Sequence, residues 1–358
     1  MTIFEELKSF YNGKKVFLTG HTGFKGSWMC MVLKELGAEV YGYSLEPPTK
    51  PSLFDILGLE GDIHSTIGDV RDYASLEKAY QAAAPDVVLH LAAQPIVLTS
   101  YKEPRYTYET NVMGTVNILE VLRQHPGAVS FLNVTTDKVY ENSDHPDHAF
   151  TEDEKLDGYD PYSNSKSCSE LVTHSYAKSF FYGKECAPAI STARSGNVIG
   201  GGDFADNRII PDCVRAVTAG KSIIVRNPYS TRPFQHVLEP VRAYLLLAMR
   251  QVSNPALCSS YNIGPDDEDC ISTGTIADLF IKNWGDNTNW INESKENAPH
   301  EAAFLKLDCS KAKSRLDWAP VWHIEKATAE TVAWYKAWHE GHDMKAFTRE
   351  QIDSFFQP

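Results

Sequence analysis

A glycine-rich turn near the start of the chain constrains the fold more than any other feature. The apolar run 15–19, KVFLT, leads into GHTGFKG, where Gly20, Gly23 and Gly26 follow the spacing G-x-x-G-x-x-G. Apolar residues then recur at helical spacing over 27–36. A strand that turns through glycines directly into a helix lets backbone N–H groups approach a diphosphate at the helix N-terminus. The turn therefore predicts a nucleotide-binding strand–turn–helix unit.

Strand and helix patterns alternate along the first half of the chain. Short apolar, β-branched runs are typical of strands buried on both faces, and the segments between them carry helical periodicity. This alternation predicts an α/β fold, a doubly wound parallel sheet of the Rossmann type with right-handed crossovers. The predicted strands are 15–19, 39–44, a short one ending at Gly68, 85–93 and 128–135, and the predicted helices are 27–36, 72–84, 105–124 and 162–181.

The pattern loosens after about residue 188. SGNVIGGGDF is glycine-rich and predicts a loop, IIPDCVRAVTAG predicts a helix, and SIIV, YNIG and FLKLD predict short strands. A last long helix is expected at 323–340, with Trp334 and Trp338 on one packed face.

Two lobes follow from this change of pattern. We expect residues 1–187 to form the Rossmann domain, with 234–262 returning to it. We expect 188–233 and 263–358 to form a smaller C-terminal α/β lobe that binds the substrate. No internal repeat or flexible linker separates the two.

Charge and cysteine content exclude several classes of protein. The formal net charge of −13 disfavours binding to nucleic acid and means that an anionic substrate needs a local basic patch. The seven cysteines include no C-x-x-C pair, as expected of reduced thiols in a cytoplasmic protein. No apolar run reaches the roughly 18 residues that a membrane span needs. We therefore expect a cytoplasmic protein with no nucleic-acid partner, no membrane partner and no metal site.

The residues at the end of the second predicted strand help to distinguish an NAD site from an NADP site. An acidic residue is usual there to bind the adenosine ribose, but the strand ends at Tyr43 and Ser44, and Glu46 is shifted. No arginine cluster awaits a 2′-phosphate, so NAD is favoured over NADP. Asp69 and Val70, after the third strand, are placed to cover the adenine.

A tyrosine and a lysine stand four residues apart in the helix predicted at 162–181. YSNSK places Tyr162 and Lys166 on one helical face. A neighbouring ammonium lowers the pKa of a phenol by stabilising the phenolate, so the pair predicts a tyrosine base near neutral pH and a lysine that also holds the nicotinamide ribose. TTDKVY ends the fifth strand at the carboxyl edge of the sheet, where doubly wound folds bind ligands. An exposed helical pair without function is the alternative interpretation.

These pieces together carry a family resemblance. TGHTGFKG, GDVRD, HLAAQ, TNVMGT, TTDKVY, YSNSK, RSGNVIGGGD, RPFQHV and YNIG follow one another over most of the chain. In this order they resemble the extended short-chain dehydrogenases/reductases. Within that family, TTD-x-VY and R-x-x-NV-x-G-x-GD resemble the nucleotide-sugar 4,6-dehydratases and epimerases. GHTGFKGSW with TTDKVYEN is similar to the members that act on CDP-glucose.

The resemblance implies a NAD-dependent lyase of deoxysugar biosynthesis for lipopolysaccharide O-antigen. It implies C4 oxidation of CDP-glucose, elimination of water across C5 and C6, and return of the hydride to C6. By the resemblance, Tyr162 removes the proton of the sugar 4-hydroxyl, and Lys166 supports Tyr162 and contacts the ribose. Thr136 hydrogen-bonds the 4-oxygen, and Asp137 matches the acid that protonates the departing C6 hydroxyl.

Lys138 departs from the wider family pattern, which has glutamate at this position. A carboxylate is an obvious base for the C5 proton, whereas a lysine serves as a base only when it is neutral. Lys138 could instead hold Asp137 in position or stabilise the enolate. The identity of the C5 base therefore stays open, with a solvated surface lysine as the plain alternative.

The resemblance also implies binding residues. Arg194, Arg208 and Arg232 are candidate cations for the diphosphate of the substrate. Asn197, in RSGNV, matches a substrate-phosphate contact, and Gln94 is a further substrate-binding candidate. The implied cofactor-binding residues are Gly20, Thr22, Gly23, Phe24, Lys25, Gly26, Ser44, Asp69, Val70, Leu91, Ala92, Ala93, Tyr162 and Lys166.

Assembly and two other functions complete the expectations. The family implies a homodimer through a four-helix bundle built from the helices at 105–124 and 162–181. A 4,6-dehydratase or 4-epimerase acting on another nucleotide sugar stays open, although an epimerase has no use for an elimination acid such as Asp137. A catalytically idle NAD-sensing or scaffold protein also stays open, but the intact Tyr162/Lys166 pair argues against it.

Overall fold

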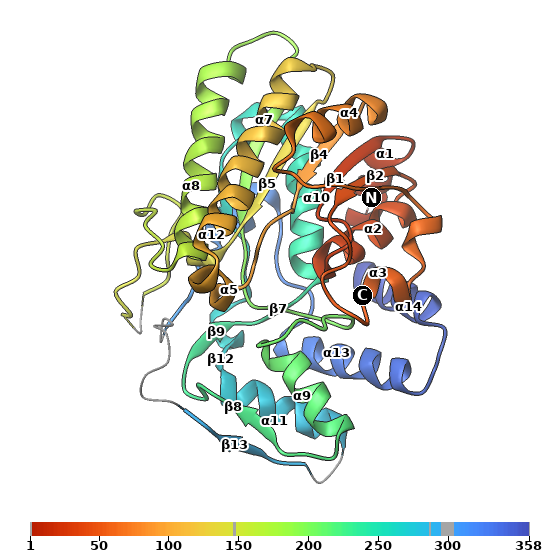
Figure 1. Cartoon of the computed structure of the whole chain (residues 1–358), viewed down its shortest axis with the longest axis vertical. Helices are drawn as coiled ribbons and strands as arrows, with labels where there is room; N and C mark the ends of the chain where they lie inside the picture. Colours follow the sequence, from red (N-terminus) through yellow and green to blue (C-terminus); the bar gives the residue numbers. More distant parts are fainter. Residues whose placement is uncertain (1, 146–147, 286–287, 295–303, 358) are drawn as a thin grey trace.

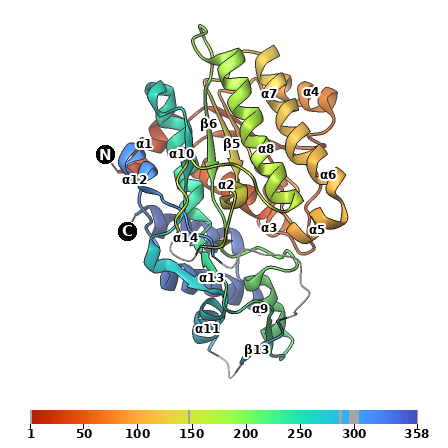
Figure 2. The same ribbon diagram turned by 90° about the vertical axis from the view of Figure 1, so that its left-hand side faces the viewer.

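A seven-stranded parallel sheet organises the chain (Figures 1 and 2). The computed structural model describes residues 2–145, 148–285, 288–294 and 304–357. The strand order is β11-β6-β5-β4-β1-β2-β3, and every neighbouring pair is parallel, which confirms the predicted doubly wound α/β fold. The strands are β1 (Lys15–Thr19), β2 (Glu39–Ser44), β3 (His64–Ile67), β4 (Val87–His90), β5 (Ser130–Thr135), β6 (Ala189–Arg194) and β11 (Ser260–Asn262).

Helices cover both faces of this sheet because alternate strand residues point to opposite sides. In β1, Val16 and Leu18 belong to one buried cluster and Phe17 to the other. The first cluster is completed by α1 (Ile3–Tyr11), α2 (Phe24–Glu35) and α10 (Leu238–Ser253), and the second by α4 (Tyr73–Ala83), α7 (Gly114–Gln124) and α8 (Pro161–Tyr176). None of the described helices is long and apolar enough to cross a membrane.

Two predicted helices are longer composites in the structure. The helix expected at 105–124 consists of α6 (Pro104–Tyr108), a π-helical turn (Glu109–Met113) and α7. The helix expected at 162–181 consists of α8 and a second π-helical turn (Ala177–Phe181). This half also contains the short α-helices α3 (Leu53–Ile56) and α5 (Val97–Lys102) and the 3-10 helices Leu59–Gly61 and Asp137–Val139.

The smaller part of the chain lies below the carboxyl edge of the sheet in Figure 1. Its helices are α9 (Ile209–Thr218), α11 (Thr273–Trp284), α13 (Ile324–His339) and α14 (Met344–Phe356), whereas α12 (Ser310–Leu316) packs against β11 and α10 beside the sheet. Its short strands pair two by two, as β7 (Val198–Ile199) with β10 (Gln235–His236), β8 (Ile223–Val225) with β13 (Trp290–Asn292), and β9 (Thr231–Pro233) with β12 (Cys270–Ser272).

Three predictions for this part were wrong in detail. FLKLD forms no strand, because Phe304 and Leu307 make isolated bridges to two different segments and not to one continuous partner. The helix expected at 323–340 is not the last one, since α14 follows it with an N-terminal cap from the Asp343 carboxylate. The loop SGNVIGGGDF contains the short strand β7.

The predicted domain boundary after residue 187 leaves β6 outside the Rossmann domain, whereas β6 lies inside the sheet. Beyond β6, α10 packs against β5 and β6, and β11 extends the sheet at its edge. The division of the chain into two lobes stays a prediction.

Candidate active site

Loops from four neighbouring strands meet at the carboxyl edge of the sheet. The glycine turn follows β1, 91–94 follows β4, 136–138 follows β5, and 195–197 follows β6. Because these strands are parallel and adjacent, their carboxyl ends lie side by side. The residues predicted to bind cofactor and substrate are therefore brought together at one edge.

The glycine turn leaves no room for side chains next to the start of α2. Gly20 has φ +79°, and a Cβ there would lie 2.8 Å from the Ala92 nitrogen. A Cβ on Gly26 would lie 2.1 Å from the Gly20 carbonyl oxygen. No side chain caps the start of α2 at Gly23, and the first backbone N–H groups of a helix have no partner within the helix. These features fit the diphosphate of a dinucleotide.

The other residues predicted around the cofactor lie at the same edge. The Thr22 hydroxyl donates to the Leu45 carbonyl at 2.8 Å and lies 2.9 Å from the Ser44 hydroxyl. Arg71 holds the Asp69 carboxylate through Nε and Nη2, at 2.9 and 2.6 Å from Oδ2.

The loop after β4 is fixed to β1. The backbone N–H groups of Leu91 and Ala92 donate to the Thr19 hydroxyl at 3.2 and 3.1 Å, and half-buried Ala93 follows them. Val70 is buried against Gly114, and half-buried Phe24 lies against Gly200.

Lys25 reaches beyond the turn into the site. Its ammonium donates to the Ser195 hydroxyl and to the Tyr244 hydroxyl, both at 3.2 Å. Burial, with the positive charges of Arg208 and Lys166, lowers the pKa of Lys25 to about 7. The turn thus contributes a cation close to the residues on α8 and α9.

Tyr162 and Lys166 lie on one face of α8, as predicted from their spacing. The Lys166 ammonium donates to the Val134 carbonyl at 3.0 Å, and burial lowers the pKa of Lys166 to about 8. Burial raises the pKa of Tyr162 to about 12, although a hydrogen bond with Thr136 and the charge of Arg208 act in the opposite direction. The expectation of a lowered phenol pKa is therefore wrong in this structure, because desolvation outweighs the nearby charge.

Asp137 is buried at the end of β5 and is held by two donors. The Thr136 hydroxyl donates to Oδ1 at 2.9 Å, and the Asn197 amide donates to Oδ2 at 3.0 Å. Lys138 is half-buried, and its backbone N–H lies 3.4 Å from the Thr136 hydroxyl oxygen. The structure thus places Thr136, Asp137 and Tyr162 together at one point of the edge.

Arg194 is not available to a diphosphate, which corrects the sequence-based candidate. Its guanidinium is 1% exposed and contacts both oxygens of the Glu170 carboxylate at 3.1 Å. It also donates to the Tyr140 hydroxyl at 2.8 Å and to the Glu152 carbonyl at 3.0 Å. Burial alone would raise the pKa of Glu170, but Arg194 and two hydroxyl donors hold it below its ordinary value.

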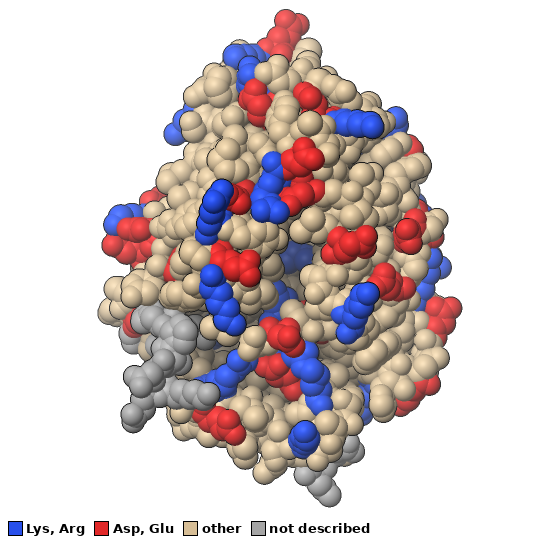
Figure 3. All heavy atoms as spheres, in the orientation of Figure 1, with Lys and Arg blue, Asp and Glu red and all other residues tan. Residues whose placement is uncertain are grey.

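Two other arginines come from the smaller part of the chain. Arg208 precedes α9 and pairs with Asp203 at 2.8 Å, and its charge acts on both Lys25 and Tyr162. Arg232 is buried in β9 and donates to the Thr231 carbonyl at 2.9 Å. Figure 3 shows acidic and basic groups mixed over one face of the molecule, with Lys or Arg atoms at the floor of a hollow near its centre.

Gln94 is used within the chain. Its side-chain amide donates to the Ile96 carbonyl at 3.2 Å and to the Thr107 hydroxyl at 2.9 Å. Its backbone N–H donates to the Asn111 amide oxygen at 2.8 Å. These bonds tie the loop after β4 to the segment that leads into α7.

Sequence reasoning missed three residues of this site. Ser195 and Tyr244 bond the Lys25 ammonium, and Glu170 pairs with Arg194 one turn beyond Lys166. Tyr244 lies within an apolar helix and belongs to no motif, so no local signal identifies it. Glu170 could have been found from its helical spacing, since it lies four residues after Lys166 on the same face.

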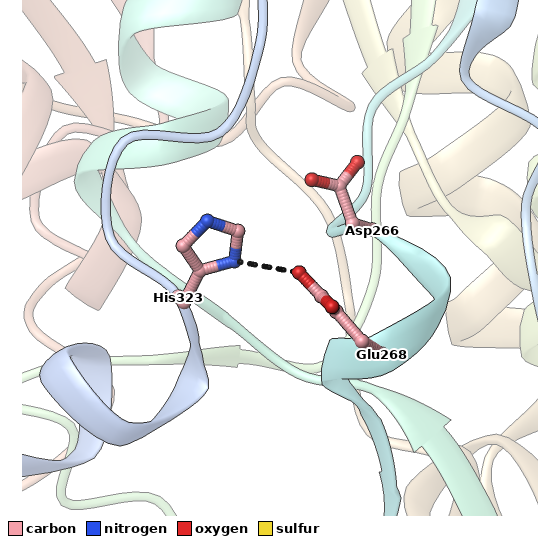
Figure 4. Close-up of side chains that lie close together, drawn as sticks. All are labelled: Asp266, Glu268 and His323. Atoms are coloured by element: carbon pink, nitrogen blue, oxygen red, sulfur yellow. Dashed lines mark ion pairs between the residues drawn. The ribbon is translucent and has the colours of Figure 1, made fainter.

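A second group of ionisable residues lies apart from this edge (Figure 4). His323 is 2.7 Å from Asp269 and 3.8 Å from Glu268, and Lys313 pairs with Asp266. Hydrogen bonding to Asp269 raises the pKa of His323. These ionisable residues therefore pair with one another and form a charge network around the start of α13.

The comparisons with known proteins agree with this geometry. The sequence profile of the family described as GDP-mannose 4,6 dehydratase matches residues 17–331. The chain belongs to this family. A CDP-glucose 4,6-dehydratase of Salmonella typhimurium is 45% identical over 352 residues, which cover 97% of this chain and 98% of that protein.

More distant relatives share the same architecture. A dTDP-glucose 4,6-dehydratase of Salmonella typhimurium is 28% identical over 353 residues, covering 90% of this chain and 93% of that protein. The crystal structure of a dTDP-glucose 4,6-dehydratase from Bacillus anthracis in complex with NAD superposes with a TM-score of 0.73 at 20% identity. It covers 93% of this chain and 99% of that one. The resemblance to extended short-chain dehydrogenases/reductases is thereby confirmed at the level of fold and family.

The Glu170–Arg194 pair leads to a stability prediction for this dehydratase-family chain. Glu170→Gln should lower the free energy of unfolding by about 3–5 kcal/mol, because it leaves the Arg194 charge buried and uncompensated. Urea unfolding measures the difference. Glu185→Gln, the same change at an exposed position, should stay within about 0.5 kcal/mol of the wild type. A Glu170→Gln chain as stable as the wild type would contradict this assignment.

Proposed function

We propose that the chain is a CDP-glucose 4,6-dehydratase, which converts CDP-glucose to CDP-4-keto-6-deoxy-glucose in deoxysugar biosynthesis. The observation that carries the proposal is the 45% identity, over nearly the full length of both chains, to a protein of that name. The meeting of Thr136, Asp137, Tyr162 and Lys166 at the sheet edge supports it. A dehydratase also has a use for Asp137, whereas a 4-epimerase eliminates nothing.

NAD is the cofactor of this proposal. The glycine turn and the start of α2 would hold its diphosphate, Asp69 and Val70 would cover the adenine, and Lys166 would contact the nicotinamide ribose. When bound, NAD supplies an acceptor for the C4 hydride and a donor of the same hydride to C6.

Tyr162 takes the proton of the sugar 4-hydroxyl in the proposed reaction. The Thr136 hydroxyl is hydrogen-bonded to both the Tyr162 phenol and the Asp137 carboxylate, which supports assigning Thr136 to the 4-oxygen of the sugar. The cations nearest the phenol favour its ionised form, and Arg208 already does so here. Burial opposes ionisation, so proton removal by Tyr162 depends on the charge assembled around it by bound ligands.

Elimination follows once C4 is a ketone, because the ketone acidifies the C5 hydrogen. A base takes the C5 proton, the C5–C6 double bond forms, and the C6–O bond breaks. Asp137 gives its proton to the departing oxygen, which leaves as water. Lys138, the next residue in the chain, would either take the C5 proton or stabilise the enolate that forms.

The smaller part of the chain would bind the nucleotide. Arg208 and Arg232 would meet the diphosphate, and an acidic chain needs such local cations. We assign the base as cytosine because of the Salmonella relative, and the alternative is another nucleotide sugar.

We further propose a homodimer through α7 and α8. These two helices lie side by side in both ribbon views (Figures 1 and 2). Large apolar residues are exposed on or next to them, among them Met113, Leu171 and Phe180. A monomer mass in light scattering at micromolar concentration would contradict this assembly.

The first functional test is product formation. The chain with NAD should turn CDP-glucose into a product with the alkali-shifted absorbance of a 4-keto-6-deoxy sugar. Tyr162→Phe should reduce the rate by about 10²–10⁴-fold, because it removes a general base. Its circular dichroism spectrum should match that of the wild type.

The same assay separates the other functions. Product from dTDP-glucose, UDP-glucose or GDP-mannose, but not from CDP-glucose, would overturn the choice of cytosine. Absence of product from all four sugars would favour a protein that only binds the dinucleotide. Full activity in Tyr162→Phe would show that another group is the base.

The second functional test concerns Lys138. If Lys138 takes part in the elimination, Lys138→Met should keep the formation of reduced cofactor on mixing with CDP-glucose but lose exchange of the C5 hydrogen with deuterium oxide. Absorbance at the reduced-nicotinamide band and proton NMR of the sugar measure the two steps. Exchange at the wild-type rate would remove Lys138 from the elimination step.

A further inference from the structure

The Asp137 carboxylate is held by a loop from a different strand. Asp137 follows β5, and the amide of Asn197, which follows β6, donates to its Oδ2 at 3.0 Å. Gly196 lies directly against the same group, since a Cβ there would be 2.0 Å from both Cγ and Oδ2 of Asp137. Asp137 is only 1% exposed. The loop 195–197 therefore fixes where the carboxylate lies.

This loop is itself anchored on both sides. The Gln235 backbone N–H donates to the Asn197 carbonyl at 3.3 Å, and the Gln235 side-chain amide donates to the Gly196 carbonyl at 3.4 Å and the Ile263 carbonyl at 2.9 Å. The Ser195 hydroxyl accepts from the Lys25 ammonium at 3.2 Å.

Asn197 has φ +48°, a left-handed conformation that asparagine tolerates better than most residues. This backbone conformation places the amide of Asn197 where it meets Asp137. A glycine would keep the conformation and lose the amide.

We propose that Asn197 is the positioning residue of Asp137. This role rests on the proposed function, in which Asp137 protonates the C6 oxygen. The amide and the Thr136 hydroxyl each bind one carboxyl oxygen, so together they fix the plane in which the acid presents its proton. Misplacing a catalytic group by about 1 Å can cost about 100-fold in rate. Asn197 thus acts on the elimination step through Asp137, a role distinct from the diphosphate contact that the family resemblance implies.

The two roles leave different kinetic signatures. A lost diphosphate contact weakens binding of the nucleotide sugar and raises KM. A misplaced acid lowers kcat for a poor leaving group such as hydroxide. It has much less effect when the leaving group is fluoride, which departs without needing full protonation.

The test compares three variants with the wild type, on CDP-glucose and on CDP-6-deoxy-6-fluoro-glucose. Asn197→Gly removes the amide and keeps the left-handed backbone. Gly196→Ala displaces the carboxylate by steric contact. Asp317→Gly, at an exposed residue with φ +43° at the end of α12, controls for adding glycine to a left-handed position. Thermal unfolding of each variant reports whether it folds. If Gly196→Ala does not fold, the kinetics of Asn197→Gly alone decide the test.

With CDP-glucose, Asn197→Gly and Gly196→Ala should lower kcat about 100-fold, with KM changed less than about threefold. With the fluoro sugar, kcat should fall only a few-fold, and Asp317→Gly should behave as the wild type. A tenfold or greater rise in KM with kcat preserved would overturn the proposal and assign Asn197 to the diphosphate. An equal loss of kcat on both sugars, or no loss in Asn197→Gly, would overturn it too. A wild type inactive on both sugars would instead refute the proposed function.

Discussion

The ion pair between Glu170 and Arg194 fixes the geometry on which the rest of the site depends. Glu170 belongs to α8 and Arg194 to β6, and the carboxylate also accepts hydrogen bonds from Thr135 of β5 and Thr192 of β6. One side chain thus ties a helix to two adjacent strands inside the protein. Tyr162 and Lys166 lie on that helix, and Thr136 and Asp137 directly follow β5, so their relative positions follow from this contact.

Burial of positive charge is the second constraint on the site. The chain is acidic overall, but the charges of Lys166 and Arg208 both act on Lys25 at the carboxyl edge of the sheet. Burial lowers the pKa of both lysines, because removing an ammonium from water disfavours its charged form. An anionic ligand would offset this repulsion. Binding of two diphosphates, those of NAD and of the proposed nucleotide sugar, would be a physical reason for keeping these cations inside an acidic protein.

Short-range patterns made much of this structure predictable. The glycine turn, the four-residue spacing of Tyr162 and Lys166, and the polar end of β5 are all local features, and a parallel sheet brings them to one edge. The roles of Arg194 and Gln94 were not predictable in the same way. An arginine in R-x-x-NV can face a ligand or a buried glutamate, and only the packing of α8 against β6 decides between them.

The direction of a pKa shift also cannot be predicted from the neighbouring residues in the sequence. A lysine four residues from a tyrosine predicts a lowered phenol pKa, but Lys166 donates to the Val134 carbonyl and desolvation raises the pKa of Tyr162. Tyr244 and Ser195 were missed because their contact with Lys25 joins segments far apart in the chain.

The most direct test of the central claim follows one hydrogen atom through the reaction. The wild-type chain with NAD is given an equal mixture of unlabelled CDP-glucose and CDP-glucose that carries both deuterium at C4 and carbon-13 in the sugar ring, and the product is analysed by mass spectrometry and NMR. The proposed dehydration predicts that deuterium moves from C4 to C6 within the same sugar, without crossover to the unlabelled molecules. Deuterium that stays at C4, or a 4-keto-6-deoxy product without deuterium at C6, would contradict it.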